Sequence, residues 1–193
     1  MIGIGLYIKS MNEFVKKFDI IEAKKRCLEY RKRILDISQT VTALHAAGAF
    51  SAMEMVDCIY FGLMKKNDSI SINNSPDTFL MSKGHSCIVQ YVILEKMGIL
   101  KEKDINAYCK PEGFLGCHPD YGVPGIEAST GSLGHGLAAG CGLALGFKLR
   151  KSNQKVFVLI SDGECNEGAV WESLLFANSK KLNNLIVFID YNK

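Results

Sequence analysis

Hydrophobic and polar residues form two kinds of pattern along this chain, one typical of strands and one typical of helices. The C-terminal part of the chain shows both patterns. Residues 155–160 and 185–189 are short apolar runs, as expected of buried strands, and a helical pattern over residues 168–181 separates them. Strand, helix and strand in this order predict a βαβ unit. A right-handed crossover then lets both strands end at the same edge of a parallel sheet. The expected fold class is α/β, with a parallel sheet flanked by helices.

The first half of the chain is predicted to be mainly helical. Apolar residues recur mostly at three or four positions over residues 12–44, which predicts an N-terminal helical segment; they are Leu28, Ile34, Ile37, Val41 and Leu44. Further helices are expected over residues 51–65, 87–97 and 103–109, the first of them after Gly48. A polar loop over residues 66–77 precedes a short apolar run at 78–81.

The longest irregular region covers residues 111–136 and is rich in glycine and proline. A loop of that length in a compact chain is usually functional. A helix-like segment follows it, in which Gly136, Gly140 and Ala144 are spaced by four. Such a face of small residues predicts the close approach of a second helix. The glycines do not have the spacing of a dinucleotide-binding loop, and no strand precedes them.

Composition narrows the class of protein. The 193 residues are 48% hydrophobic, enough for one domain with a real core, and the net charge of +3 is too small to predict nucleic-acid binding. The N-terminal apolar run is too short for an export signal or a membrane span. Seven cysteines without a CxxC pair therefore predict reduced thiols in a cytoplasmic protein. Zinc binding by Cys109, Cys117 and His118 is not favoured, because the paired ligand spacing is missing.

Asp162 and Asn192 directly follow the two strands of the predicted βαβ unit. They are expected at the carboxyl edge of the sheet, where open α/β sheets bind their ligands. Carboxylate and amide oxygens suit Mg²⁺, which also keeps positions for phosphate oxygens and water. Gly163 would let the backbone approach a phosphate, and the helix start behind it favours negative charge. An ordinary turn at Asp162 and an ordinary strand-end asparagine are the structural alternative.

Five motifs in a fixed order give the chain a family resemblance. They are HAAGAFSAMEM (45–55), FLMSKGH (79–85), GCHPD (116–120), PGIEASTGSLGHG (124–136) and SDGECNEG followed by DYNK (161–168 and 190–193). Together they resemble thiamine-diphosphate enzymes, and more narrowly transketolase, in particular the N-terminal subunit of two-chain transketolases. The resemblance implies the thiamine-diphosphate-binding fold, with residues 1–193 as a single, incomplete diphosphate-binding domain.

The resemblance also implies roles for individual residues. The ligands of Mg²⁺ or Ca²⁺ are Asp162 and Asn192. The residues implied to bind thiamine diphosphate are His85, Gly131, Ser132, Leu133, Asp162, Gly163, Glu164 and Asn192. His45, His85 and His118 match catalytic histidines, a role that suits imidazole because attack of a thiazolium carbanion on a ketose needs proton delivery near pH 7. Glu167 and Glu172 match acidic residues that lie between the two cofactors of a dimer.

A reaction and partners follow from the same resemblance. A transketolase transfers a two-carbon ketol unit between sugar phosphates, and the glutamate that activates its cofactor lies in a C-terminal domain. The expected partner is a C-terminal subunit that carries this pyrimidine domain, and the assembled pair is expected to form dimers. The family's third metal ligand is a backbone carbonyl two residues beyond Asn192. We therefore expect this chain to be incomplete and inactive by itself.

Departures from the family pattern leave other interpretations open. HAAG at His45 replaces the more common HPGG, and Ser161 stands at the first glycine of the GDG motif. His135 replaces a frequent glutamine and is expected to be structural. A 1-deoxyxylulose-5-phosphate synthase-like subunit or a 2-oxo-acid dehydrogenase-like subunit would use the same cofactor for another reaction. A truncated, non-catalytic interaction module would keep the fold without the chemistry.

Overall fold

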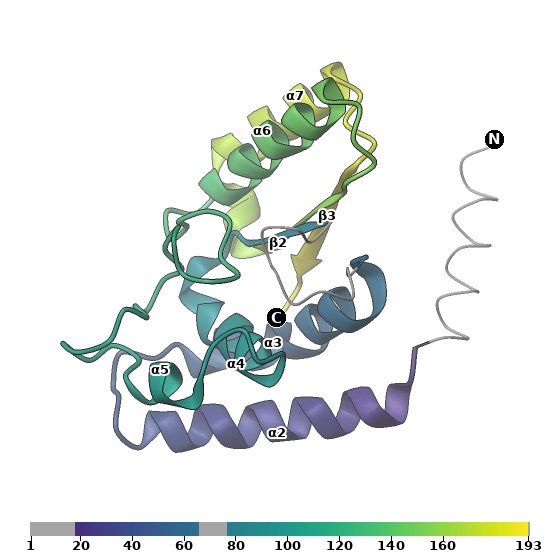
Figure 1. The fold of residues 1–193 in the computed structure, drawn as a ribbon. Coiled ribbons are helices and arrows are strands. Elements are labelled where there is room, and N and C mark those ends of the chain that lie inside the picture. The colour runs from purple at the N-terminus through teal and green to yellow at the C-terminus, as the bar shows by residue number, and fades with distance from the viewer. Residues whose placement is uncertain (1–17, 66–76, 193) are drawn as a thin grey trace.

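Three parallel strands form the centre of the fold, in the order β1–β2–β3 (Figure 1). They are β1 (Thr78–Met81), β2 (Val156–Ser161) and β3 (Leu185–Asp190). The computed structural model describes residues 18–65 and 77–192 of the chain. Both strand pairs are parallel, as the βαβ pattern predicted for β2 and β3, and Ser161 lies opposite Asp190 at the carboxyl ends of these two strands. The predicted α/β class is confirmed.

Side chains along the strands point alternately to two faces of the sheet, and each face has its own core. Phe79 and Phe157 belong to the larger core, whereas their neighbours Leu80 and Val158 belong to the smaller one on the opposite face. All residues of β1 and β2 are buried. This continuous apolar pattern is typical of parallel strands that are covered by helices on both sides.

The larger core lies between the sheet and the helices of the first half of the chain (Figure 1). These are α2 (Ile20–Ser38), α3 (Ala46–Cys58) with a π-helical continuation (Ile59–Leu63), α4 (Cys87–Lys96) and α5 (Glu102–Asn106). α4 is buried at every position from Cys87 to Leu94 and so packs in the middle of this layer. α2 begins at Asp19, whose side chain accepts hydrogen bonds from the N–H groups of Ile21 and Glu22.

The opposite face of the sheet is covered by α6 (His135–Leu149) and α7 (Gly168–Ser179) (Figure 1). The small residues of α6 were predicted to meet another helix, which is wrong for Gly136 and Gly140. A Cβ atom at Gly136 would collide with Ser82, and one at Gly140 would lie 2.5 Å from Cγ2 of Val158 in β2. These two glycines therefore let α6 pack closely against the sheet.

The N-terminal helix is shorter than predicted. Within the described residues it covers Ile20–Ser38 rather than 12–44, and residues 12–17 of that prediction lie outside the described part of the chain, as does most of the predicted polar loop. The helix ends just before three β-branched residues, Thr40, Val41 and Thr42, whose side chains lose freedom in a helix.

The second helix begins earlier than predicted, at Ala46 instead of residue 51. Gly48 lies inside its first turns, although we expected the helix to begin after this glycine. A Cβ atom at Gly48 would lie only 2.7 Å from Oγ of Ser86. The glycine is therefore explained by close packing between α3 and the segment after β1, and it does not mark a helix boundary.

α3 and its continuation, Ala46–Leu63, are long and apolar enough to cross a membrane by length and composition alone. Their packing is that of a core helix. Met53 and Val56 are fully buried in the larger core. Asp57, also buried, binds Arg26 of α2 with 2.8 Å between Oδ2 and Nη2. Packing between α2 and α4 thus accounts for the apolar composition of this helix.

Candidate active site

The segments that follow β2 and β3 meet at one edge of the sheet. The N–H group of Asp162 donates a hydrogen bond to the carbonyl of Asp190 (3.1 Å), so Asp162 and Asn192 leave the sheet at the same edge. The Oδ1 atom of Asp162 accepts a hydrogen bond from the N–H of Gly163 (2.9 Å), and Asn192 is exposed. The predicted meeting of these strand ends is confirmed; their role as metal ligands stays a prediction.

Asp162 and Asn192 offer one carboxylate and one amide oxygen to a cation. Among residues 18–65 and 77–192, no group of three or more His, Cys, Asp or Glu side chains could hold a metal ion. Asp162 and Asn192 stay the two side-chain ligands predicted for this site. Octahedral Mg²⁺ commonly binds one or two protein carboxylates and fills its other positions with phosphate oxygens and water. The donor set is compatible with that mode of binding.

His45, His85 and His118 come from three separate parts of the chain and lie together as a histidine cluster. His45 is the N-cap residue of α3, His85 lies in the 3₁₀-helix Gly84–Ser86, and His118 lies in the long loop. The ring of His45 meets that of His85 edge to face, with 5.5 Å between centroids, and its centroid is 6.4 Å from that of His118. The structure therefore brings all three predicted catalytic histidines into one place.

The surroundings of His85 favour its neutral form. Burial lowers the pKa of this half-buried imidazole, and the positive charge of Lys83 and the other two histidines lower it further, while the carboxylate of Asp190 acts in the opposite direction. A neutral imidazole has one nitrogen that accepts a proton and one that donates. His85 is therefore favoured as a neutral imidazole, which can accept a proton at one ring nitrogen.

The segment 131–133, predicted to line the cofactor rings, packs against the histidine cluster. A Cβ atom at Gly131 would lie 3.0 Å from Cδ2 of His118. Just before it, Oγ1 of Thr130 donates a hydrogen bond to the carbonyl of Met81 at the end of β1 (2.6 Å). The long loop is thus fixed to the carboxyl edge of the sheet, next to the histidines.

Glu164 lies at this edge with a fully buried side chain. Its carboxylate accepts hydrogen bonds from Oγ of Ser82, from the N–H of Gly134 (2.7 Å) and from the N–H of Ser161 (3.2 Å). We predicted Glu164 among the cofactor-binding residues. Both of its carboxylate oxygens bind protein donors, so the side chain joins the segment after β1 and the end of β2 to the start of α6, and a role in cofactor binding stays a prediction.

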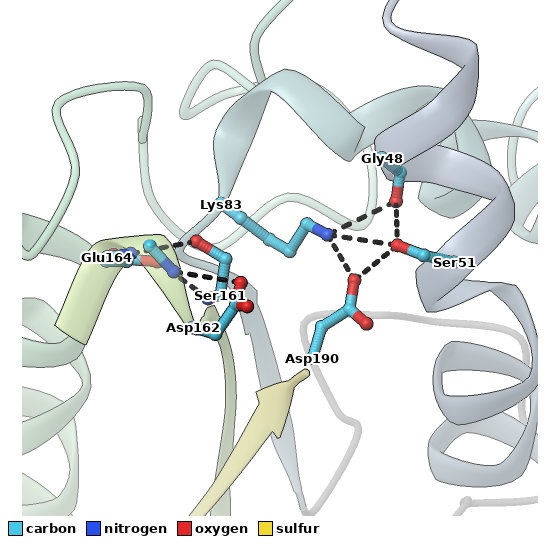
Figure 2. Close-up of polar contacts among 8 residues, drawn as sticks. Gly48, Ser51, Lys83, Ser161, Asp162, Glu164 and Asp190 are labelled. Atoms are coloured by element: carbon cyan, nitrogen blue, oxygen red, sulfur yellow. Dashed lines mark hydrogen bonds and ion pairs between the residues drawn. The ribbon is translucent and has the colours of Figure 1, made fainter. Parts of the chain in front are cut away.

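A second buried acid at this edge, Asp190, binds the ammonium group of Lys83 (Figure 2). Neither residue was predicted from the sequence. The available signals were a lysine soon after the apolar run of β1 and an aspartate that closes the apolar run of β3. Charged side chains are almost never fully buried unless they are paired. A lysine next to a strand end is nevertheless usually solvated, so no sequence pattern pairs these two.

Comparison with known proteins identifies the family. A family model described as "Transketolase, thiamine diphosphate binding domain" matches residues 23–193. The chain belongs to the transketolase family. The resemblance inferred from the five motifs is thereby confirmed.

Two curated relatives are each named as one subunit of an apulose-4-phosphate transketolase. The protein from Phocaeicola vulgatus is 37% identical over 163 residues, which are 84% of this chain and 58% of that protein. The protein from Actinobacillus succinogenes is 34% identical over 184 residues, which are 95% of this chain and 66% of that protein. This transketolase chain therefore spans less than two thirds of the length of either relative.

The solved structure of transketolase from Leishmania mexicana has the same fold. It superposes with a TM-score of 0.75 at 28% sequence identity, over 86% of this chain and 27% of that one. The predicted thiamine-diphosphate-binding fold is confirmed by this likeness together with the family match.

Three further residues of interest in this transketolase chain lie at helix starts or on α7. Glu167 is the N-cap residue of α7, Glu172 lies in its second turn, and both are exposed. His135 is the exposed first residue of α6, with Nδ1 3.3 Å from the carbonyl oxygen of Leu133. These positions leave the two glutamates accessible, and the bond of His135 is local, as expected of a structural residue.

The residues at the sheet edge fit the cofactor named in the description of the transketolase family model. Gly163 is exposed, and a Cβ atom there would meet no atom within 4 Å, so its backbone is open to a phosphate group. Oxygen donors at Asp162 and Asn192 suit a divalent cation. An exposed glycine backbone and hard oxygen donors are compatible with a diphosphate bound through a metal ion.

Proposed function

We propose that this chain is the diphosphate-binding subunit of a transketolase, which holds thiamine diphosphate through Mg²⁺ (or Ca²⁺) and transfers a two-carbon ketol unit between sugar phosphates. The observation that carries the proposal is that the histidine cluster and the segments with Asp162, Gly163 and Asn192 lie at the same edge of a parallel sheet. Residues 1–193 then belong to one diphosphate-binding domain. Membership of the transketolase family supports this proposal.

Residues at different positions of the chain have different proposed roles in binding and catalysis. Asp162 and Asn192 bind the cation, the backbone at Gly163 faces the diphosphate, and the segment 131–133 lines the cofactor rings. When bound, thiamine diphosphate supplies a carbanion for attack on a ketose carbonyl. The histidine cluster holds protons at the substrate oxygens, and the lowered pKa of His85 favours a neutral imidazole that accepts a proton.

A second chain completes the proposed enzyme. The two relatives whose names describe single subunits of a transketolase support a partner chain, which we propose to be C-terminal and to carry the pyrimidine domain. Glu167 and Glu172 then lie between two cofactors when the assembled pair forms a dimer. Without its partner the chain is inactive, and we place the assembled enzyme in the cytoplasm.

The experiment that tests the cofactor site compares Asp162→Ala with His118→Ala in the assembled protein. Isothermal titration with thiamine diphosphate and Mg²⁺ is expected to show no metal-dependent binding for Asp162→Ala. His118→Ala is expected to bind like the unchanged protein and to lose turnover. Asp36→Ala, at an exposed position of α2, is the matched control. Normal binding by Asp162→Ala would show that the metal assignment is wrong.

A substrate comparison separates the proposed reaction from its alternatives. Turnover with ketose phosphates as donors is expected for a transketolase. Turnover with pyruvate and an aldehyde acceptor would indicate 1-deoxyxylulose-5-phosphate synthase-like chemistry, and turnover with other 2-oxo acids a dehydrogenase-like subunit. Absence of thiamine diphosphate binding in the assembled protein would favour a non-catalytic interaction module.

A further inference from the structure

A buried pair of opposite charges lies at the edge that carries the proposed cofactor site. The side chains of Lys83 and Asp190 are 0% and 4% exposed, and their charged groups are in contact. Removing two charges from water has a desolvation cost, which their attraction offsets only with good geometry and additional hydrogen bonds. Replacing such a pair with apolar residues is often neutral for stability. The contacts of this pair indicate a more specific role than stability.

Lys83 and Asp190 connect the ends of all three strands to α3 (Figure 2). Lys83 follows β1, and its ammonium group binds the carboxylate of Asp190 at the end of β3 and the carbonyl of Gly48 in α3 (3.2 Å). The hydroxyl of Ser51 in α3 donates a hydrogen bond to the same carboxylate. The backbone carbonyl of Asp190 accepts the N–H of Asp162, directly after β2.

Three residues of the proposed site lie close in sequence to the contacts of this pair. Asn192 follows Asp190 by two positions, and His85 follows Lys83 by two positions. His45 is the N-cap residue of α3, whose first turns contain the carbonyl of Gly48. The buried contact therefore joins the elements that carry one proposed metal ligand and two proposed catalytic histidines.

We infer that Lys83 and Asp190 are positioning residues for the proposed cofactor and metal site. The pair fixes the direction in which the chain leaves β3, so that Asn192 stays beside Asp162. It also holds α3 against the segment after β1, so that the rings of His45 and His85 meet. Lys83 is fully buried and acts through these neighbours. This inference rests on the proposed function and adds two positioning residues to the proposed site.

The test uses a double variant, because a single substitution would leave an unpaired buried charge and endanger the fold. Lys83→Met together with Asp190→Asn removes both charges and nearly preserves side-chain volume. Binding is measured in the chain assembled with its partner, with thiamine diphosphate and Mg²⁺ as probes, by isothermal titration. Each probe is titrated while the other is saturating, so that the metal and the cofactor are measured separately.

The double variant is expected to unfold within a few degrees of the unchanged protein and to bind Mg²⁺ at least tenfold more weakly. A matched control is the partly buried pair of Arg26 and Asp57, which joins α2 to α3 with 2.8 Å between charged atoms. Arg26→Met with Asp57→Asn is expected to leave both binding constants unchanged. An effect confined to the first double variant separates positioning of the site from a general loss of packing.

Ser51→Ala provides an independent variant that keeps the charge pair and suits a helix. It removes one hydrogen bond to Asp190, and its expected effect is a Mg²⁺ dissociation constant about threefold higher, with the helix intact. Should the double variant not fold, Ser51→Ala decides the question. Unchanged Mg²⁺ binding in Ser51→Ala, or in the folded double variant, overturns the inference while the proposed function stands. If the unchanged assembled protein binds no thiamine diphosphate with Mg²⁺, the proposed function fails and this inference fails with it.

Discussion

The thiol of Cys117 lies 3.3 Å from Nδ1 of His118. The backbone carbonyl of His118 accepts a hydrogen bond from the hydroxyl of Tyr91 in α4 (3.1 Å). Both the ring and the main chain of this histidine are therefore held by neighbours. With Nδ1 engaged by the thiol, Nε2 is the ring nitrogen that the proposed reaction would use.

Replacing Cys117 with alanine is expected to reduce turnover of the assembled enzyme about fivefold without changing thiamine diphosphate binding. The physical reason is the loss of one hydrogen bond that orients His118, with a net value of about 1 kcal/mol. Steady-state kinetics and isothermal titration measure the two quantities. Cys117→Ser keeps a hydrogen-bonding group and should retain most activity, and Cys58→Ala, on α3, is the control. Unchanged turnover in Cys117→Ala would show that the thiol does not orient the ring.

His85 is expected to titrate below 6.5, the usual pKa of histidine, because burial and the charge of Lys83 disfavour its protonated form. Between the lowered pKa in the folded state and the ordinary pKa in the unfolded state, the unfolded chain binds more protons. The free energy of unfolding therefore falls as pH decreases through this window, and the contribution is fully present above pH 6.5. Nuclear magnetic resonance of ¹³C-labelled histidines measures the pKa directly.

The same titration on His85→Gln assigns the signal, and thermal unfolding between pH 5 and 7 measures the consequence. The variant is expected to lose part of the pH dependence of its unfolding temperature. A pKa of His85 at or above 6.5 would contradict the prediction.

Gly140→Ala is expected to destabilise the protein by about 1–3 kcal/mol, the usual cost of overpacking a dense core. The new Cβ atom would lie 2.5 Å from Cγ2 of Val158, so α6 would have to move away from the sheet. Denaturant unfolding measures the change. Gly142→Ala in the same helix is the matched control, because its Cβ atom would meet nothing within 4 Å. This control should stabilise the protein by about 0.5–1 kcal/mol, and equal effects of the two variants would contradict the close packing.

Glu164→Ala is expected to be more destabilising than Glu164→Gln. The alanine variant leaves Ser82, Gly134 and Ser161 without their buried acceptor, at a cost of about 1–3 kcal/mol for each donor that stays unpaired. The glutamine oxygen can still accept from Ser82 and Gly134, so only the bond from Ser161 is lost. Urea unfolding of both variants tests this order, and an equally stable alanine variant would show that water replaces the carboxylate.

Sequence patterns predicted the C-terminal βαβ unit well, and the physical reason is its regularity. The apolar runs of β2 and β3 and the helix between them were placed within one or two residues of their observed ends. Parallel pairing then required Asp162 and Asn192 to meet at one edge. β1 was seen only as an apolar run, because four residues without alternation do not distinguish a strand from a buried helix segment.

The histidine cluster could be predicted only from the family resemblance. His45, His85 and His118 belong to a helix start, a 3₁₀-helix and a loop, and no periodicity relates such positions. The contact between Lys83 and Asp190 joins residues 107 positions apart, and neither the lysine nor the aspartate differs in sequence from a solvated strand-end charge. The hydrogen bonds of the Glu164 carboxylate within the protein were not predicted either, since a sequence does not show which way a side chain points.

The two neighbouring contacts of Ser82 and Lys83 also bear on how the sheet assembles. All four residues of β1 are buried, so they show no polar alternation that would define one alignment against β2. Ser82 and Lys83 directly follow β1, and the side chain of Ser82 reaches Glu164 beside α6 while that of Lys83 reaches Asp190 beside α3. A slip of β1 by one residue would turn the ammonium group toward α6 and separate both acids from their donors. The buried charges thus penalise misaligned pairings of a strand whose apolar residues alone would accept them.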